Sequence, residues 1–148
     1  MAAYNKFNFF IENLANKQID ILGTTAGANI DLFYVALTTD TPDAANDDEL
    51  ADLTEITAIN GYTAGGKDIG LQATRTGDTI TFTAIDVTWV ATSGNLGNAA
   101  CRYFPYYDFT HANKKLVAWW DYGNVFAVGS GESLTLDFGT TLAALGAT

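Results

Sequence analysis

The sequence predicts a mainly β fold, an antiparallel β-sandwich or jelly roll preceded by one α-helix. Short apolar or alternating segments recur with turn residues between them at intervals of about ten residues, which is typical of all-β domains. Threonine, a β-branched residue that suits a pleated surface, occurs 20 times against 3 serines. Together these two observations indicate about seven short strands whose polar faces are lined with threonine.

The size of the chain favours one domain. We expect its 148 residues to form a helix over about 5–17, a β-sandwich over about 28–139 and a short apolar C-terminal tail. No apolar run approaches the roughly 20 residues of a membrane-spanning helix, and no signal peptide is recognisable. One cysteine excludes an internal disulfide. The sequence therefore predicts a soluble protein made in a cytoplasm.

The net charge limits the classes of partner that we expect for this chain. There are 17 acidic and 7 basic residues, which gives −10. Nucleic acid phosphates and anionic membranes both attract positive charge, so we expect neither as a partner. Seven of the acidic residues lie within residues 40–55, which contain no lysine or arginine. This stretch predicts an exposed, solvated acidic loop.

The first segment has helical periodicity. Apolar residues at Phe7, Phe10, Ile11 and Leu14 follow the spacing of one helix face, and Asn5 is a suitable N-cap. The glycine-containing residues 23–27 end the pattern. A helix over about 5–17 is therefore expected to dock through these apolar residues.

The next segments predict strands and turns. Residues 30–37 are almost all apolar, which indicates a strand buried on both faces. Leu50, Leu53 and Ile56 are spaced three apart, so one or two helical turns are expected after Asn46 as N-cap. Residues 60–66 form a glycine-rich turn.

A change of phase marks the following strand. Threonines occupy odd positions from 79 to 83, whereas apolar residues occupy odd positions from 85 to 89. Because a slip of one residue exchanges the two faces of a strand, we predict a β-bulge or bend near Ala84 and Ile85.

The last part of the chain predicts three further strands with a short apolar segment between them. Residues 99–107 contain Pro105, which favours an edge strand or a bulge. Residues 116–122 form the next strand, and Gly123 with Asn124 is expected to turn the chain before the apolar residues 125–128. Residues 133–138 alternate again, with Leu134 and Leu136 on one face.

Few residues are suited to catalysis. His111, the only histidine, lies in a polar stretch that resembles a hairpin loop, and we interpret it as an exposed loop residue. Cys101 lies among apolar residues and is expected to be a buried thiol. A catalytic base needs a nucleophile and an orienting acid brought near it, but Cys101 is ten residues from His111 and serine is scarce, so no catalytic residue is assigned.

The many carboxylates leave a glycosidase activity as an open alternative. Such an enzyme needs two carboxyl groups at a fixed separation, one of them with a raised pKa. Asp86 and Asp121 lie beside apolar residues, and Asp121 follows Trp119 and Trp120, which could form a sugar platform. The alternative is that the two tryptophans point to opposite faces, one to the core and one to the surface or an interface. We favour this alternative.

No cofactor or metal is expected. The acidic stretch lacks the D-x-[DN]-x-[DN]-G spacing of a calcium loop, although its carboxylates leave cation binding open. Glycine-rich residues 61–70 lack a dinucleotide or P-loop pattern.

The 19 aromatic residues suggest interaction surfaces, because a domain of this size cannot easily bury them all and aromatic side chains anchor interfaces. Copies of the same chain, as a trimer or dimer, or a larger assembly are the expected partners. The candidate interface residues are Phe7, Phe10, Tyr103, Phe104, Tyr106, Tyr107, Trp119, Trp120 and Tyr122.

Several blocks resemble a group of small virion structural proteins of tailed bacteriophages. They span nearly the whole chain, at residues 4–8, 14–16, 51–56, 60–66, 86–89, 118–123 and 131–138. The resemblance implies a non-enzymatic capsid decoration (cement) protein on the virion capsid surface, with the major capsid protein of the shell as partner. A tail or fibre-associated structural protein is the alternative, and a carbohydrate-binding module a weaker one. Residues 102–109 carry more aromatics than the group's pattern, which affects the expected partner contacts at that edge.

Overall fold

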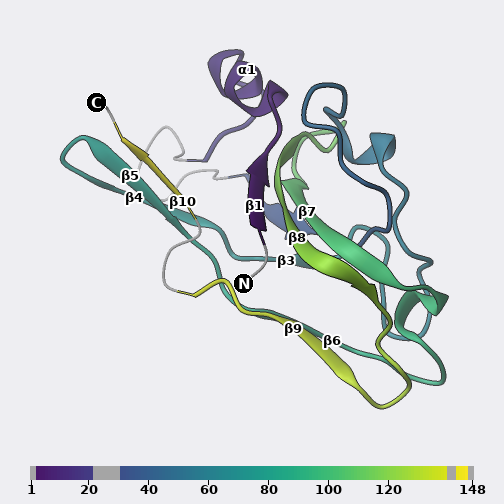
Figure 1. Cartoon of the computed structure of the whole chain (residues 1–148). Coiled ribbons are helices and arrows are strands. Elements are labelled where there is room, and N and C mark those ends of the chain that lie inside the picture. The colour runs from purple at the N-terminus through teal and green to yellow at the C-terminus, as the bar shows by residue number, and fades with distance from the viewer. Residues whose placement is uncertain (1–2, 22–30, 140–142, 147–148) are drawn as a thin grey trace.

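The structure is a computed structural model that describes residues 3–21, 31–139 and 143–146 (Figure 1). It is mainly β, with antiparallel sheets and one short N-terminal helix, as the sequence predicts. The helix is α1 (Phe9–Ala15), and 3-10 turns occupy Leu50–Asp52 and Leu96–Asn98. The strands are β1 (Ala3–Lys6), β2 (Phe33–Val35), β3 (Lys67–Asp68), β4 (Gln72–Thr76), β5 (Thr79–Thr83), β6 (Val87–Val90), β7 (Cys101–Asp108), β8 (Leu116–Phe126), β9 (Ser133–Leu136) and β10 (Ala143–Gly146).

The strands form three antiparallel sheets. A central sheet has the order β1-β8-β7-β2-β3, a second has the order β10-β5-β4, and a third pairs β6 with β9. Figure 1 shows β4 and β5 projecting to one side of the central sheet and the β6–β9 pair running along another. None of the helices in the described segments has the length and hydrophobicity needed to cross a lipid bilayer.

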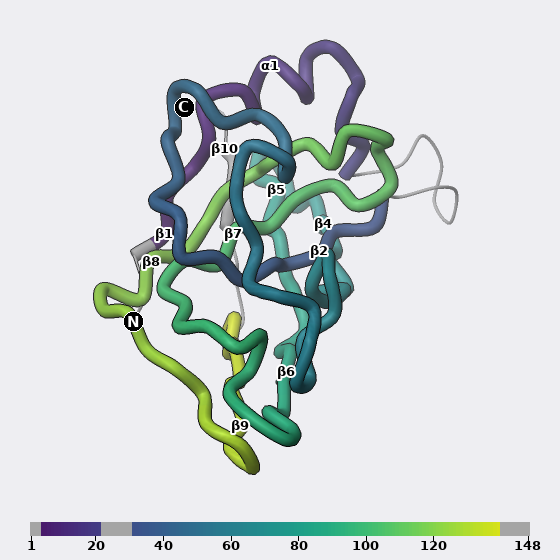
Figure 2. The backbone as a smooth tube through the Cα atoms, turned by 90° about the vertical axis from the view of Figure 1, so that its right-hand side faces the viewer, coloured from purple at the N-terminus to yellow at the C-terminus, as the bar shows by residue number. Residues whose placement is uncertain are grey.

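The central sheet is covered on both faces. One face joins a large apolar core that includes Phe104, Tyr106 and Trp89. The other packs against Leu50 and Leu53, which come from the acidic stretch. In Figure 2 the blue segment that contains this stretch crosses in front of β7 and β8. The double cover explains how one domain buries most of its aromatic residues.

The strand expected at 30–37 is shorter than predicted. Ile30 lies outside the described residues, and β2 contains only three residues. Phe33 and Val35 are fully buried, whereas Tyr34 is half-buried and stacks on Phe109 with ring centroids 4.1 Å apart.

The N-terminal helix begins later than predicted, and Asn5 is not its N-cap. Residues 3–6 pair with β8 as an edge strand, and the helix starts after Asn8. This shift rotates the buried helix face, so that Phe10 and Asn13 are buried while Ile11 is 57% exposed. Strand pairing prevails because it satisfies backbone groups that a frayed first helical turn would leave unpaired. The break predicted at 23–27 lies outside the described residues.

The phase change at residues 84–86 marks a change of sheet, so of the two predicted alternatives, a bulge or a bend, the bulge is wrong. β5 pairs with β4 and β10, whereas β6 pairs with β9. Between them, Ile85 is 62% exposed, while Val87 and Trp89 are buried. The two apolar phases therefore belong to two different strands that pack on the core from different sheets.

Pro105 lies in a central strand, so the edge-strand alternative is wrong. β7 has β8 on one side and β2 on the other. Its ladder with β8 is irregular between Tyr106 and Tyr107, next to the proline. Pro105 accepts a hydrogen bond from the Ala36 N–H through its carbonyl at 2.9 Å. The N–H and C=O positions of one strand residue point to the same side, so the missing N–H faces β2 and leaves the ladder with β8 unaffected. The irregularity, which is close to the second predicted alternative, lies one residue beyond the proline and leaves Val117 of β8 without a partner residue in β7.

One prediction for the C-terminal third is also wrong. Gly123 and Asn124 do not end the strand, because β8 continues to Phe126. Gly123 adopts φ +92°, and residues 122–125 bulge outward opposite Arg102 of β7. The apolar tail contains strand β10, which pairs with β5. Residues 133–138 do form the predicted strand, over Ser133–Leu136.

Candidate functional site

The acidic stretch, residues 40–55, is ordered by its own carboxylates. The Asp43 carboxylate accepts the Ala45 N–H at 2.9 Å and the Asn46 side-chain amide at 2.7 Å. These bonds, that of the Asn46 amide first, hold the pKa of Asp43 below its ordinary value. Asp47 accepts the Asp43 N–H at 2.7 Å. The stretch is therefore a set of tight turns, which corrects the expectation of a merely solvated loop.

The remaining turns of this stretch use the same device. Asp52 accepts the N–H groups of Asp48 and Glu49, each at 2.9 Å, and so caps the 3-10 turn. The helical turn thus begins after Glu49 and not after Asn46. Asp40 accepts the Thr54 N–H at 2.7 Å. Each carboxylate fixes the direction of its neighbours, so the negative charges hold defined positions.

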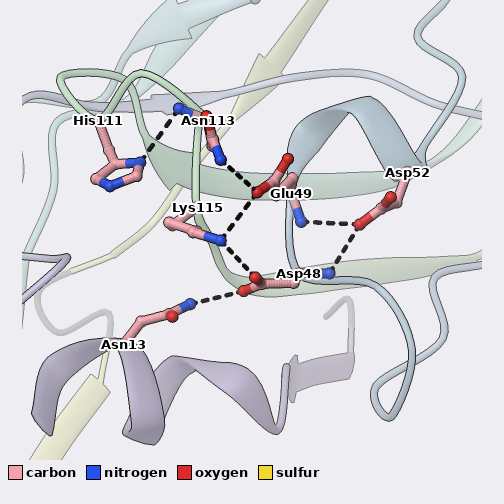
Figure 3. Close-up of polar contacts among 7 residues, drawn as sticks. All are labelled: Asn13, Asp48, Glu49, Asp52, His111, Asn113 and Lys115. Carbon is pink, nitrogen blue, oxygen red and sulfur yellow. Dashed lines mark hydrogen bonds and ion pairs between the residues drawn. The ribbon is translucent and has the colours of Figure 1, made fainter. Parts of the chain in front are cut away.

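Lys115 fastens the acidic stretch to the central sheet (Figure 3). Its Nζ atom lies 2.5 Å from an Asp48 oxygen and 2.9 Å from a Glu49 oxygen, and the lysine side chain is only 8% exposed. Asn13 of α1 donates to the other Asp48 oxygen at 2.7 Å. The cluster thereby joins the helix, the acidic stretch and the start of β8.

The chemistry of this cluster is structural. Burial alone would lower the pKa of Lys115, but the hydrogen bonds and charges of Asp48 and Glu49 raise it above its ordinary value. The amine is therefore protonated at neutral pH and has no free lone pair for nucleophilic attack. His111 lies in the β7–β8 loop, half-buried, and its Nδ1 accepts the Asn113 N–H at 3.1 Å. Asn113 donates in turn to Glu49 at 2.8 Å.

An open cleft of about 420 Å³ lies beside the cluster. Leu50 and Leu53 supply apolar lining, while Glu49, Glu55 and Lys114 supply charged groups. Glu55 is itself held by the hydroxyl of Tyr62 and by the Gly65 N–H at 2.8 Å. The cleft and the ordered carboxylates together form a negatively charged surface with apolar lining.

Asp108, at the end of β7, has a perturbed carboxyl group. The residue is fully buried, and its Oδ1 atom accepts the N–H groups of Thr110 and His111. Its Oδ2 atom has no hydrogen-bond donor among the described residues, and the Asp31 carboxyl lies beside it. Burial, with the charge of Asp31, raises the pKa of Asp108 to about 7. Asp108 can therefore hold a proton near neutral pH.

Most of the predicted interface residues are in the interior. Seven of the nine are at most 8% exposed, because the two covers of the central sheet enclose them: Phe7, Phe10, Tyr103, Phe104, Tyr106, Tyr107 and Trp119. Trp120 is half-buried against Tyr4, Tyr106 and Phe138. Tyr122, at 56% exposed, is the exposed member. The aromatic excess is thus mainly core, and the argument that such a domain could not hide it is wrong.

The two tryptophans point to opposite faces as predicted, but neither is the expected surface residue, because each packs on one of the two cores. Trp119 packs in the cluster with Phe7, at a ring-centroid distance of 4.5 Å, and Trp120 faces the other core. Asp121 is bound by Arg102 at 2.7 and 2.9 Å, which holds the pKa of this carboxyl below its ordinary value. A glycosidase general acid needs the opposite shift.

Other candidates have structural partners. Asp86 accepts the Phe138 N–H at 2.9 Å. Cys101 is buried as predicted, and burial raises the pKa of its thiol to about 11. In the described part of the chain, no group of three or more His, Cys, Asp or Glu side chains is arranged to hold a metal ion.

Sequence reasoning missed the lysine–carboxylate cluster. Asp48 and Lys115 are separated by 67 positions. Neither has a local pattern that indicates a buried partner. No protein-family model, curated protein or solved structure matches this chain. The resemblance to phage virion proteins therefore stays a prediction.

Proposed function

We propose that this chain is a non-enzymatic virion structural protein of a tailed bacteriophage, which decorates the capsid and stabilises the head shell as an oligomer. The observation that carries the proposal is the ordered acidic surface, in which all seven carboxylates of residues 40–55 have hydrogen-bond partners. The sequence resemblance supports the same class. The protein would be made in the host cytoplasm and act on the capsid surface.

A preordered charged surface suits this role. Binding costs conformational entropy when loops must be ordered, and the turns made by Asp43, Asp47 and Asp52 remove much of that cost. A basic patch on the major capsid protein would complement the carboxylates, and apolar groups of the shell would fit the cleft beside Leu50 and Leu53. Many equivalent sites on a shell then multiply a modest single-site affinity.

Co-sedimentation with purified, undecorated phage shells tests the proposal. The double variant Asp43→Asn with Asp47→Asn keeps an oxygen acceptor for each turn but removes two negative charges. We expect it to bind shells at least about tenfold more weakly at low salt. The matched control is Asp68→Asn with Asp137→Asn, because the side chains of these two residues also accept a nearby backbone N–H. The control should bind like the wild type.

The alternative functions give different results. Binding to isolated tails but not to shells would overturn head decoration and favour a tail or fibre-associated protein. Binding to a glycan array that is lost in Trp120→Ala would favour a carbohydrate-binding module. Equal shell binding by the acidic-stretch variant and its control would show that another surface makes the contact.

A further inference from the structure

The β4–β5 arm, residues 72–83, is thinly covered by the rest of the described chain. In β4 four of five residues are exposed, and only Ala73 is half-buried. Residues 76–79 at its tip are all exposed, and Figure 1 shows this hairpin projecting from the body. One face of the arm contacts the core, where Phe82 is buried and Ala73 and Ile80 are half-buried. Gln72, Thr74 and Thr76 on the other face of β4 are exposed, so the outer half of the arm has little support from its own chain.

One edge of the arm is already used. β10 pairs with β5, from Ala143 opposite Phe82 to Gly146 opposite Thr79. In the part of the chain that the structure describes, no strand pairs with the other edge, that of β4. β4 has no proline and no bulge, and Arg75 is its one charged residue, so few of the usual devices that prevent edge pairing are present.

The hydrogen-bonding groups at this edge can be assigned. Gly77 and Asp78 form a two-residue turn between the paired residues Thr76 and Thr79. In such a hairpin the pair beside the turn exchanges hydrogen bonds, and the pairs then alternate along the ladder. Ala73 and Arg75 therefore direct their N–H and C=O groups away from β5, toward the open edge.

The distribution of charge favours a second copy of the chain as the partner at this edge. The whole chain carries −10, so two copies repel each other over most of their surfaces. Within the arm, however, Arg75 and Asp78 are the only charged residues, and their charges cancel. A second copy can therefore approach at this neutral edge more easily than at the acidic stretch.

We propose that β4 is a self-association edge, at which two copies pair antiparallel about a two-fold axis. The two three-stranded sheets would join as β10-β5-β4 to β4-β5-β10. The outward groups of Ala73 must then meet those of the partner's Arg75, which places Thr74 on the axis, opposite Thr74 of the partner subunit. This register pairs all five residues of β4, and it avoids placing two arginines opposite each other. The inference does not depend on what the chain binds.

Sedimentation velocity over a wide concentration range is the first test. We expect a wild-type monomer–dimer equilibrium. Thr74→Lys places two ammonium groups opposite each other on the axis and should weaken the dimer at least about tenfold. Thr57→Lys makes the same charge change at an exposed threonine outside the arm, and it should leave the affinity of the dimer unchanged. A wild-type protein that stays monomeric, or a Thr74→Lys dimer of wild-type affinity, would overturn the proposal.

Cysteine cross-linking tests the register. Opposite residues of a non-hydrogen-bonded pair have Cα atoms about 4.5 Å apart, within the range of about 4.4–6.8 Å that a disulfide spans. Thr74→Cys should therefore form a disulfide-linked dimer on mild oxidation, whereas Arg75→Cys, which faces Ala73 of the partner subunit, should not. The native Cys101 is buried and does not compete. Cross-linking through Arg75→Cys but not through Thr74→Cys would overturn the proposed register. If neither variant cross-links more than the control Thr57→Cys, the proposal that β4 is the self-association edge is overturned.

Discussion

The central sheet and the β4–β5 arm are both antiparallel structure with alternating side chains, yet they differ in what covers them. The central sheet has apolar cores on both faces, one of them closed by residues of the acidic stretch. The arm is exposed over its outer half. The comparison teaches that alternation specifies a strand, whereas coverage by distant segments determines how much stability that strand contributes.

The largest expected effect on stability comes from truncating a buried aromatic side chain of the central sheet. Phe104 is 2% exposed and packs against Phe126 and Tyr122 at ring-centroid distances of 6.1 and 6.5 Å. Phe104→Ala should lower the free energy of unfolding by about 3–5 kcal/mol, because it loses buried contacts and leaves a cavity. Urea denaturation measures the change, with exposed Val125→Ala as control. A loss in assembly without a loss in stability would instead restore Phe104 as an interface residue.

Removing the ion pairs that join the acidic stretch to the central sheet should have a smaller effect on stability. Lys115→Met keeps the volume of the side chain but leaves Asp48 and Glu49 without their cation. Because both carboxylates are about a quarter to a third exposed and can regain water, we expect a loss of about 1–3 kcal/mol. Exposed Lys6→Met is the control. A double-mutant cycle with Asp48→Asn should give a coupling energy well above zero. Additive losses of stability would contradict an energetic link between Lys115 and Asp48.

The pH dependence of stability tests the buried Asp108 carboxyl at the end of β7. The pKa of Asp108 rises from 3.8 to about 7 on folding, so the folded state binds more protons between these values. Stability should therefore fall as pH increases from about 4 to 7, by at most about 1.4 kcal/mol per pH unit for one proton. Asp108→Asn keeps the Oδ1 acceptor and should flatten this slope in thermal melts. An unchanged slope would assign the pH dependence to other groups.

The smallest effect is expected in the arm. Thr74→Ala removes only an exposed side chain and should change the stability of the monomer by no more than about 0.5 kcal/mol. Hydrogen exchange adds a local measurement. At low protein concentration the amides of Ala73 and Arg75 should exchange much faster than those of β7 and β8. Equal protection in both regions would contradict the comparison.

Local patterns predicted the strands better than their partners. The alternation from 79 to 83 and that from 133 to 138 both correspond to observed strands. The phase change near Ala84 was correctly located but not correctly explained, because a bulge and a change of sheet produce the same pattern in a sequence. Which strands pair depends on contacts between distant segments, and no window of residues contains them.

The N-terminal segment illustrates a competition between two local preferences. Residues 5–17 have a helical period, and yet residues 3–6 pair with β8. The edge of the central sheet offers backbone partners to this segment, and they outweigh a single turn of helix. The same reasoning applies to β10, whose apolar sequence carries no alternation but whose backbone completes the ladder of β5.

The sequence by itself determined a mainly β, acidic chain with a buried cysteine, because composition and short-range periodicity report local backbone preference and charge. Only the tertiary structure decided that the aromatic residues form the core, that Lys115 is paired with Asp48 and Glu49, and that β4 keeps an open edge. Each of these depends on two covers assembled from residues far apart in the chain. Burial is a property of that assembly, so a side chain can be an anchor at a surface or part of a core with the same local sequence.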